Sequence, residues 1–353
     1  MINTSLPPVY EVDPLRDRRW QSFVQRHPQA SIFHSAGWLD ALHRTYGYEP
    51  VVFSTSPPAS DLENGMAFCR IRSWITGNRI VSLPFSDYCE PLCDRDEEFE
   101  NLMSHLHAVR VDQEWRYIEV RPVQQNFGDA ARKLGFSAGA KYLLHRVNLE
   151  PTAEEIFRRV DKNSVQRRVR RAEREGVLEV RGKSEDLLRE FYRLVVGTRA
   201  RHNLPPQPYV WFRNLLRCLG EAADLRLAYL KDVPVAAVLV FHFKDTSYYK
   251  YGCSDERFHK LGAIPFLLWR AVLHAKALGS RTFDLGRTEE HQQGLVKFKN
   301  HWTPSSASLT YWTSEPSPSS SQDWKLRMVK CICAYMPERL LASMGTLIYR
   351  HRG

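Results

Sequence analysis

The stretch Thr246–Trp302 reads TSYYKYGCSDERFHKLGAIPFLLWRAVLHAKALGSRTFDLGRTEEHQQGLVKFKNHW and decides the fold that we expect for this chain. It opens with an aromatic segment, Tyr248–Tyr251, whose residues suit the half-buried surface of a β-strand. Apolar residues then recur every three or four positions across residues 261–278, which is the period of one helix face. A second strand follows at Thr282–Leu285. The stretch therefore predicts a strand, a helix and a strand in succession, as in α/β proteins.

Polar and charged side chains gather just past the ends of these two strands. Tyr249, Tyr251 and Asp255 belong to the end of the first strand, and Asp284 and Arg287 to the end of the second. Folds of the α/β class bind ligands at this edge of their sheets. We therefore expect the active site here, with Asp284 either as a general base or as a group that caps the turn.

The bulk composition limits the classes of protein that fit. The chain has 353 residues, enough for about two domains of roughly 100–200 residues each. Its residues are 43% hydrophobic, which is enough for packed cores, and its net charge is +10. This charge favours an anionic partner, such as a phosphate-bearing metabolite, a nucleic acid or an acidic membrane. The alternative is a basic protein whose arginines are scattered over the surface.

Cysteine usage and hydropathy indicate the compartment. The chain has seven cysteines and no pair of C-x2-C units, so we expect no metal site and reduced thiols in the cytoplasm. The first 15 residues lack the pattern of a signal peptide. The longest apolar run, Val233–Phe243, is shorter than the roughly 18 residues of a membrane-spanning helix.

The order of predicted elements occurs twice along the chain. In each half three strands, a helix and a further strand follow one another, and Trp115–Pro122 takes the place in the first half that Arg281–Thr288 takes in the second. We therefore expect an α/β fold with mixed sheets, in two similar domains at residues 1–150 and 151–314.

Residues 315–353 form the third segment of the chain. The sequence at 315–321, EPSPSSS, has the composition of a linker. Residues 323–353 have the period of basic amphipathic helices. Such a tail can contact the inner face of an anionic membrane, or it can dock back on the body of the protein.

Two groups of cations precede the opening stretch. Eight Lys or Arg residues fall between Arg158 and Arg174, and Val165, Val169 and Ala172 give a thin apolar face, so we expect one helix over residues 164–175. Its cations are either a solvated face or a ridge that binds phosphate or RNA. The residues assigned to such a ridge are Arg167, Arg168 and Arg171. Further on, Arg199 and Arg201 lie at the end of a helix, where they either complement the helix dipole or bind an anion.

No generic catalytic motif occurs in the chain: there is no G-x-S-x-G, Walker loop or H-E-x-x-H sequence. Lys299 lies beside Phe298 and Trp302. A cation among aromatic groups can stabilise a developing oxyanion, whereas a surface lysine would extend its ammonium into solvent.

Six short sequences together resemble the Fem-type transferases of the GNAT-like acyltransferase superfamily. They are FHSAGWL at 33–39, LPFSDY at 83–88, RRVRRAEREG at 167–176, YYKYGCS at 248–254, FDLGR at 283–287, and GL at 294–295 with FK at 298–299. The resemblance implies two tandem GNAT-like domains. It also implies transfer of an acyl or aminoacyl group to an amine, often in a cell-envelope precursor, and members near this pattern are associated with exopolysaccharide synthesis.

The resemblance also implies roles for single residues. Phe298 and Lys299 are similar to a catalytic Phe-Lys pair in which the lysine stabilises the tetrahedral oxyanion. Tyr249 and Tyr251 resemble strand tyrosines that line the acceptor site, and Arg199 or Arg201 resembles an arginine that binds phosphate. The residues expected to bind substrate are Tyr249, Tyr251, Arg287, Arg199, Arg201 and Asp87.

One loop departs from the GNAT pattern Q/R-x-x-G-x-G/A, whose backbone N–H groups bind the pyrophosphate of coenzyme A. The corresponding stretch is His259–Pro265. Gly262 matches the first glycine, but Ile264 replaces the second small residue and Pro265 removes a donor. The donor is therefore open between acyl-CoA and aminoacyl-tRNA, and no bound cofactor is expected.

Two functions follow from the sequence. The first is an enzyme that transfers an acyl or aminoacyl group to an amine of a cell-envelope glycan, lipid-linked or peptidoglycan-type precursor. The second is a non-catalytic protein on a transferase scaffold that recognises RNA or an anionic lipid-linked sugar. The sequence leaves the acceptor and the oligomeric state open.

Overall fold

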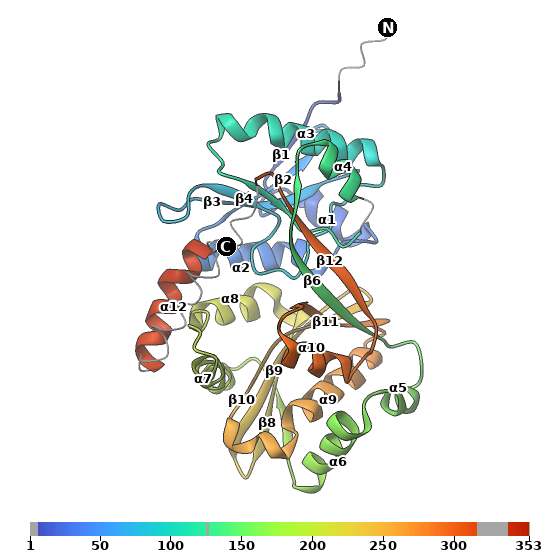
Figure 1. Ribbon diagram of the computed structural model, residues 1–353, viewed down its shortest axis with the longest axis vertical. Coiled ribbons are helices and arrows are strands. Elements are labelled where there is room, and N and C mark those ends of the chain that lie inside the picture. The colour runs from blue at the N-terminus through green and yellow to red at the C-terminus, as the bar shows by residue number, and fades with distance from the viewer. Residues whose placement is uncertain (1–5, 125–126, 316–337, 353) are drawn as a thin grey trace. The chain divides into compact units, whose positions relative to one another are not determined.

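The computed structural model describes residues 6–124, 127–315 and 338–352 (Figure 1). The described residues belong to two compact units. The first unit contains those within Met1–Lys141, Leu309–Ser320 and Ile348–Gly353, and the second contains those within Tyr142–Ser308 and Ser321–Leu347.

The first unit has a mixed sheet in the order β1-β2-β3-β4-β5-β12. Among these neighbours β4 and β5 pair in parallel, whereas β1–β2, β2–β3, β3–β4 and β5–β12 pair antiparallel. The elements are β1 (Tyr10–Val12), α1 (Arg18–Arg26), η1 (Ile32–His34), α2 (Ala36–Tyr46), β2 (Glu49–Ser54), β3 (Met66–Ile71), β4 (Arg79–Val81), α3 (Asp96–Asp112), β5 (Ile118–Val120), α4 (Phe127–Lys133) and β12 (Ser306–Thr313).

The second unit has a sheet in the order β6-β11-β10-β9-β8-β7, in which only β10 and β11 are parallel. Its strands are β6 (Ser137–Asn148), β7 (Leu178–Arg181), β8 (Ala223–Leu230), β9 (Val233–Phe243), β10 (Thr246–Ser254) and β11 (Thr282–Glu289). Its helices are α5 (Ala153–Arg159), η2 (Lys162–Gln166), α6 (Arg167–Arg174), α7 (Glu185–Arg201), α8 (Tyr209–Leu219), η3 (Gly220–Ala222), η4 (Glu256–Leu261), α9 (Ala263–Ala277) and α10 (Gln293–Asn300).

The two units share one topology. In each, four strands pair antiparallel in chain order, a helix leads to a parallel fifth strand, and a sixth strand pairs antiparallel with the fifth. In each unit the sixth strand comes from the other half of the sequence. Strand β6 follows β5 but pairs with β11, and β12 follows β11 but pairs with β5. The predicted α/β fold with mixed strand pairing, repeated in two similar units, is confirmed.

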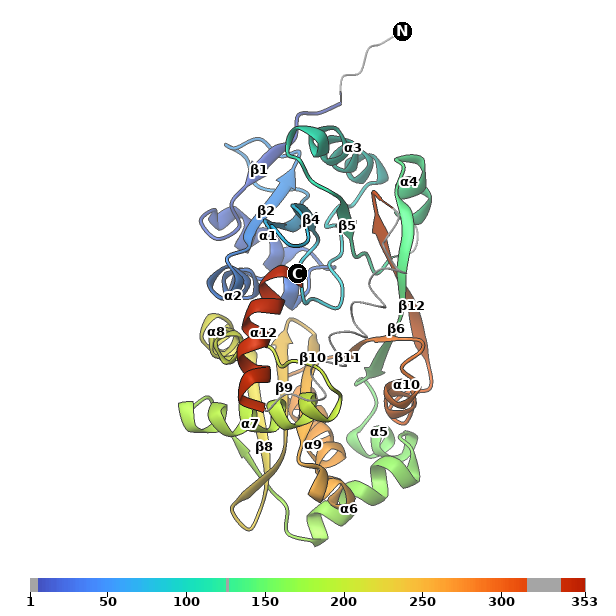
Figure 2. The ribbon, with the colours of Figure 1, turned by 60° about the vertical axis from the view of Figure 1, so that its left-hand side comes forward.

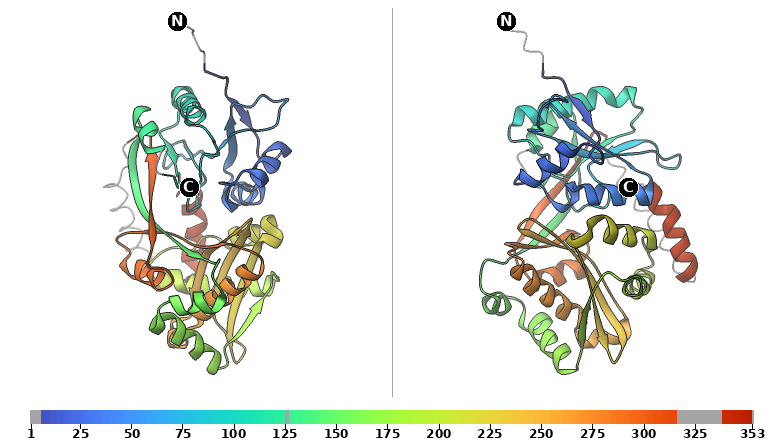
Figure 3. Two further views of the ribbon diagram at one scale, coloured as in Figure 1. Left: turned by 90° about the vertical axis from the view of Figure 1, so that its right-hand side faces the viewer. Right: turned by 180° about the vertical axis from the view of Figure 1, so that it is seen from behind.

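Helix α9 organises the second unit. Its buried residues pack with β8, β9 and β10 in one apolar core. Helix α7 lies on the other face of these strands and contributes no residue to this core (Figures 1 and 3). The packing of α9 follows from the apolar spacing that predicted a helix over residues 261–278, since this spacing places Leu268, Ala271 and Ala275 on the buried side.

The basic segment forms two helical pieces rather than one. A π-helical turn, Lys162–Gln166, precedes α6, and Asp161 accepts hydrogen bonds from the backbone N–H groups of Asn163 and Ser164 at 3.0 and 2.6 Å. Val169 and Ala172 are buried, so the predicted apolar face does pack, and α6 lies against α9 (Figure 2). The α-helix begins later than the predicted residue 164 because the aspartate cap fixes a wider first turn.

Helix α12 (Glu338–Arg352) ends inside the first unit. Tyr349 and His351 are buried, and their carbonyl oxygens accept hydrogen bonds from Tyr48 Oη at 2.8 Å and Arg79 Nη2 at 2.9 Å. The end of the tail therefore docks on the body. The part of the predicted tail at 323–337 lies outside the described residues. Among the described helices, none combines the length and the apolarity needed to cross a membrane.

This docking predicts a stability effect. Tyr349→Ala will lower the free energy of unfolding by about 3 kcal/mol, because it removes a buried ring that packs against Phe85. Leu347→Ala is the control, since that side chain is 61% exposed and its loss should change the free energy by less than about 0.5 kcal/mol. Urea unfolding of both variants provides the measurement. Equal effects would contradict the docked end of α12.

Candidate active site

A β-bulge in β11 forms the centre of the candidate site. Asp284 lies opposite Arg146 on β6, while Arg287 lies opposite Leu144, so β11 has one residue more than β6 between these pairs. Gly286 takes up the extra length with φ of +73°, a value that favours glycine. Bulges of this kind re-aim backbone groups and are common beside active sites.

Lys299 of α10 reaches this bulge. Its side chain is buried, and its Nζ donates hydrogen bonds to the carbonyl oxygens of Gly286 at 2.7 Å and Arg287 at 2.9 Å. Burial of an ammonium is costly unless polar groups receive its hydrogens. The carbonyls turned toward α10 by the bulge supply these acceptors, which is not the arrangement of a surface lysine.

Asp284 is also buried, and it binds the backbone N–H of Gly286, whose C=O binds Lys299. Its Oδ1 accepts a hydrogen bond from the Gly286 N–H at 2.7 Å, and its Oδ2 pairs with Arg146 Nε at 3.0 Å. A carboxylate therefore binds the N–H of Gly286 while an ammonium binds its C=O. These contacts are those of a group that caps and holds the bulge, the second of the two roles that we considered for Asp284.

His145 belongs to this cluster, and sequence reasoning missed it. It is fully buried, its Nε2 lies 2.9 Å from Asn300 Oδ1, and its Nδ1 has no hydrogen-bond partner among the described residues. Burial lowers the pKa of His145 and the charge of Lys299 lowers it further, whereas the hydrogen bond that His145 donates to Asn300 Oδ1 raises it. The imidazole is thus held neutral and links β6 to the residue after Lys299. A single histidine inside a strand gave no motif by which to find it.

A pocket of about 560 Å³ opens beside α9 and α10. Three of the predicted site residues, Arg168, Gly262 and Phe298, contribute to its lining. The remaining lining residues are Ser164, Val235, Ser254, Phe258, His259, Lys260, Ala263, Ile264, Pro265, Gly294, Lys297 and His301. The pocket is therefore bordered by the predicted donor loop, by the first turns of the basic segment and by one face of α10.

Gly262 fixes the loop at the edge of this pocket. Its φ is +79°, and a Cβ at this position would lie 2.7 Å from both the Cβ and the carbonyl oxygen of Arg168. Only glycine lets α6 approach the start of α9 this closely. In the first turn of α9, Pro265 has no N–H and that of Phe266 bonds to Gly262 O, so Ala263 and Ile264 supply the N–H groups that can face an anion.

The pocket combines cations with apolar side chains. Arg168, Lys260 and Lys297 lie around it, and Phe258 and Phe298 contribute aromatic surface. This combination suits a ligand that carries both phosphate and an apolar group.

Helix α10 separates the two residues of the predicted Phe-Lys pair. Gly294, Lys297, Phe298 and His301 recur at helical spacing and line the pocket, whereas Lys299 projects from another side of the helix to the β11 bulge. The structure thus places Phe298 at the pocket. It places Lys299 at the β11 bulge, where its hydrogen bonds tie α10 to β11.

The two strand tyrosines face different surroundings. A register irregularity in the β9–β10 pairing lies between Tyr249 and Tyr251. Tyr249 packs against the core that α9 covers, and burial raises the pKa of its phenol. The hydroxyl of Tyr251 instead accepts hydrogen bonds from Trp211 Nε1 at 2.8 Å and Gln207 Nε2 at 3.1 Å. The structure does not bring the two phenols together.

The remaining predicted residues have the following places. Arg201 Nη1 donates to the carbonyl of Ser254 at 2.8 Å, so it supports the edge of the pocket from α7. Arg199 lies in the same last turn of α7. The guanidinium of Arg287 lies over the ring of Tyr142 at 4.1 Å.

The other predicted residues do not line the pocket. Arg167 and Arg171 are exposed on α6. Asp87 belongs to the first unit, where its carbonyl accepts a hydrogen bond from Tyr311 Oη at 2.7 Å.

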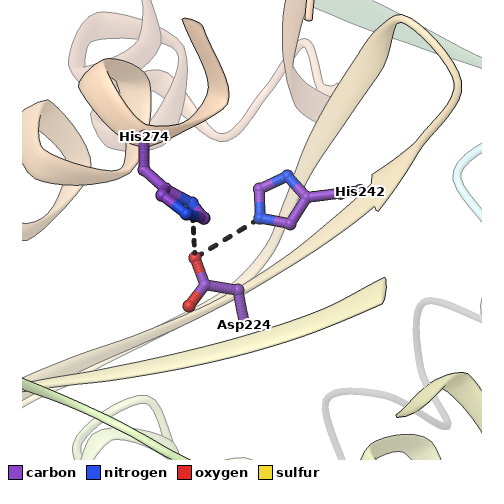
Figure 4. A group of neighbouring side chains, drawn as sticks. All are labelled: Asp224, His242 and His274. Atoms are coloured by element: carbon purple, nitrogen blue, oxygen red, sulfur yellow. Dashed lines mark hydrogen bonds and ion pairs between the residues drawn. The ribbon is translucent and has the colours of Figure 1, made fainter. Parts of the chain in front are cut away.

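A second polar cluster in this unit contains Asp224, His242 and His274 (Figure 4). Their ligand atoms lie within 4.8 Å of one another, as in a metal site. However, Arg226 donates to Asp224 Oδ2 at 2.7 Å through Nε, and Arg181 donates to Oδ1 at 3.1 Å. Two guanidinium groups already neutralise this carboxylate, so the donor set does not suit a divalent cation.

Burial and the neighbouring arginines determine the protonation states of Asp224 and His274. Burial opposes ionisation of Asp224, but hydrogen bonds from His242 and Arg226 and the charges of Arg226 and Arg181 hold its pKa well below the usual range. Burial lowers the pKa of His274, and Arg181 and Arg226 lower it further. The network is therefore built around an ionised aspartate and a neutral His274.

Comparisons with known proteins agree with this fold. Residues 159–299 match the family described as "Acetyltransferase (GNAT) domain", a range that includes the pocket loop and ends at Lys299. No curated protein matches the chain.

Three solved structures resemble the chain over most of its length. The crystal structure of FemX gives a TM-score of 0.69 at 13% identity, covering 89% of this chain and 99% of FemX. The C-terminal domain of a putative lysylphosphatidylglycerol synthetase from Agrobacterium fabrum gives 0.56 at 14% identity, covering 90% and 95%. A tandem GNAT protein from the clavulanic acid biosynthesis pathway gives 0.54 at 9% identity, covering 88% and 99%. The chain thus has a GNAT-like fold, and the matched domain supports an acyltransferase.

The buried histidines predict how stability depends on pH. The pKa values of His145 and His274 are lowered in the folded protein, so between their folded values and the unfolded value near 6.5 the unfolded chain binds more protons. The free energy of unfolding will therefore fall as the pH drops from about 7.5 to 5.5. Urea unfolding across this range, compared with His145→Asn and His274→Asn, provides the measurement. A flat profile in the wild type, or a slope that neither substitution reduces relative to the wild type, would contradict the neutral buried histidines.

Proposed function

We propose that the protein transfers an acyl or aminoacyl group from a phosphate-bearing donor to an amine of a cell-envelope precursor. The observation that carries the proposal is the cationic pocket at the start of α9, which lies within the residues that match the GNAT domain. One wall of this pocket is the helix that carries the buried Lys299.

The donor binds with its phosphates at the loop of Gly262. The N–H groups of Ala263 and Ile264 and the side chains of Arg168, Lys260 and Lys297 are the anion-binding groups there. Both acyl-CoA and aminoacyl-tRNA carry phosphate, which in acyl-CoA is separated from the thioester by the pantetheine arm and in aminoacyl-tRNA lies in the backbone beside the acylated ribose. Acyl-CoA is the donor of GNAT domains, whereas the exposed Arg167 and Arg171 on α6 would extend the contact to a tRNA backbone.

The reaction needs positioning and charge stabilisation rather than an activated side-chain nucleophile. The lone pair of a neutral amine attacks the acyl carbon, a C–N bond forms, and the carbonyl oxygen becomes an oxyanion. The C–S or C–O bond to the donor then breaks, its electron pair leaves with the donor, and the nitrogen loses a proton. In our proposal the phosphates occupy the pocket and the acyl group reaches the side of α10 that faces the β11 bulge. There the buried ammonium of Lys299 stabilises the oxyanion, because a preorganised charge acts strongly where water is excluded.

The acceptor is an amine of an envelope glycan, lipid-linked or peptidoglycan-type precursor. One structurally similar protein is named for lysylphosphatidylglycerol, an aminoacylated lipid, and this supports an envelope acceptor. Within the second unit we assign its binding to Tyr251, Arg287, Arg199 and Arg201, whereas Tyr249 packs against the core that α9 covers. A link to exopolysaccharide synthesis is part of the same proposal.

One observation favours the non-catalytic alternative. The arginines of α6 are exposed. Within the part of the chain that the structure describes, Arg171 alone of the three proposed ridge residues has an ion-pair partner, Glu175 at 3.8 Å. A scaffold that only recognises RNA or an anionic lipid-linked sugar would use this ridge. Binding with a steep salt dependence but without turnover would support this alternative.

Lys299→Met tests the catalytic assignment. It keeps the length of the side chain and removes the charge, so kcat for release of donor thiol in the presence of amine acceptors should fall at least about 100-fold. Lys297→Met is the matched control on the same helix; it lines the pocket and should raise KM for the donor with a smaller change in kcat. Circular dichroism and thermal unfolding establish that both variants are folded. An unchanged kcat in folded Lys299→Met would contradict the assigned role.

Gly262→Ala tests the donor loop. The new Cβ would meet the backbone of Arg168 at 2.7 Å, so α6 must move from α9 and the affinity for the donor should fall at least about tenfold. Gly294→Ala is the control, because no atom lies within 4 Å of a Cβ there although the residue lines the same pocket. Calorimetry with acetyl-CoA and with charged tRNA provides the measurement. Equal affinities of the two variants would place the donor elsewhere.

A further inference from the structure

We infer that the turn between β3 and β4 of the first unit is a membrane anchor that inserts Trp74 and Ile75 into the surface of an anionic bilayer. The turn spans residues 72–78 and projects from its sheet (Figure 1). The inference rests on exposure, rigidity and charge at this turn, and it holds whether or not the proposed transfer reaction is correct.

The apolar side chains at the tip are unusually exposed. Trp74 is 88% exposed, more than any other large apolar side chain among the described residues, and its neighbour Ile75 is 53% exposed. Folding normally buries most of a tryptophan, because its ring is the largest apolar surface that a residue can remove from water. Two such neighbours at the apex of one turn therefore need an explanation outside the folded core.

The turn is held rigidly, so the exposure is not that of a loose loop. Ser73 Oγ accepts a hydrogen bond from the Thr76 N–H at 3.0 Å, and the Gly77 N–H donates to the Ser73 carbonyl at 2.8 Å. Arg79, which is buried, donates from Nη1 to Thr76 Oγ1 at 2.7 Å. These bonds fix the base of the turn and leave Trp74 at its apex without a route into the core.

The end of α12 supports the same turn. His351 is buried, its Nδ1 lies 2.9 Å from Ser73 Oγ, and its ring meets that of Trp74 edge-on at 5.8 Å. The buried histidine is a fixed base against which the indole rests. An anchor that is preorganised in this way loses little conformational freedom when it inserts.

The charges around the tip match an anionic surface. Arg72, at the start of the turn, and Arg116 are exposed. Arg72 pairs with Glu49 at 3.3 Å, but both groups are solvated and such pairs are weak. Arg116 donates to the Thr76 carbonyl at 3.4 Å, so its cation lies beside the turn. Tryptophan at the level of the headgroups with arginine around it is the usual composition of a peripheral contact with acidic lipid.

The size of the tip favours a bilayer over a protein partner. A specific protein interface buries about 800 Å² on each partner and involves about 20–30 residues a side. The apolar part of this turn is two adjacent side chains. Such a wedge is sufficient for reversible attachment to a bilayer when cations add to it, since neither contribution alone anchors a protein stably.

Co-sedimentation of the full chain with vesicles tests the anchor. The protein should bind vesicles of mixed phosphatidylcholine and phosphatidylglycerol, bind pure phosphatidylcholine weakly, and lose affinity as salt increases. Trp74→Ser with Ile75→Ser should lower the affinity for the mixed vesicles at least about tenfold. Val111→Ser is the matched control, since this side chain is 73% exposed in the same unit and should leave the affinity unchanged.

A second variant separates the turn from the basic tail. Replacing Lys325, Arg327 and Lys330 with Gln removes tail charges and should change the affinity less than the double substitution in the turn. Thermal unfolding provides the check that all variants are folded. The inference is overturned if the wild-type chain does not bind the mixed vesicles, if the turn variant binds as the wild type does, or if only the tail variant loses affinity.

Discussion

The candidate site depends on the backbone of one residue, Gly286 in the β11 bulge. Asp284 accepts its N–H and Lys299 donates to its C=O, both at 2.7 Å. The ion pair of Asp284 with Arg146 ties β11 to β6, and Lys299 ties α10 to β11. Because the opposite face of α10 forms a wall of the pocket, the same contacts that solvate the buried ammonium also hold the place where the donor is proposed to bind. Stability and chemistry are therefore coupled at this point.

Local patterns in the sequence were enough to predict most helices and strands of the second unit and their order. The apolar period over residues 261–278 predicted α9, which runs from Ala263 to Ala277. The strand predicted at Thr282–Leu285 continues to Glu289, because its pairing with β6 passes through a bulge that no local pattern reveals. The exchange of β6 and β12 depends equally on distant pairing, and local periodicity carries no information about it.

The candidate site was predicted in part for the same reason. Gly262 and Arg168, which the sequence assigned to an anionic ligand, line one pocket, and Phe298 lines it as well. His145 and Arg146 were missed, since their importance comes only from lying opposite the bulge. Residues that are close in sequence do not always share surroundings. The side chains of Phe298 and Lys299 leave α10 on different sides, and the register irregularity of β10 separates Tyr249 from Tyr251. Side-chain direction, rather than position in a motif, decides which groups meet.

The central claim is that a phosphate-bearing donor binds at the start of α9, and amide hydrogen exchange tests it most directly. With acetyl-CoA or charged tRNA bound, the N–H groups of Ala263 and Ile264 should exchange more slowly, because they would donate to the donor phosphates. Amides of α9 that bond within the helix serve as the internal reference. Slower exchange confined to these two amides and the pocket face of α10 is the predicted result. A donor that binds while both amides exchange at their unliganded rate would contradict the account.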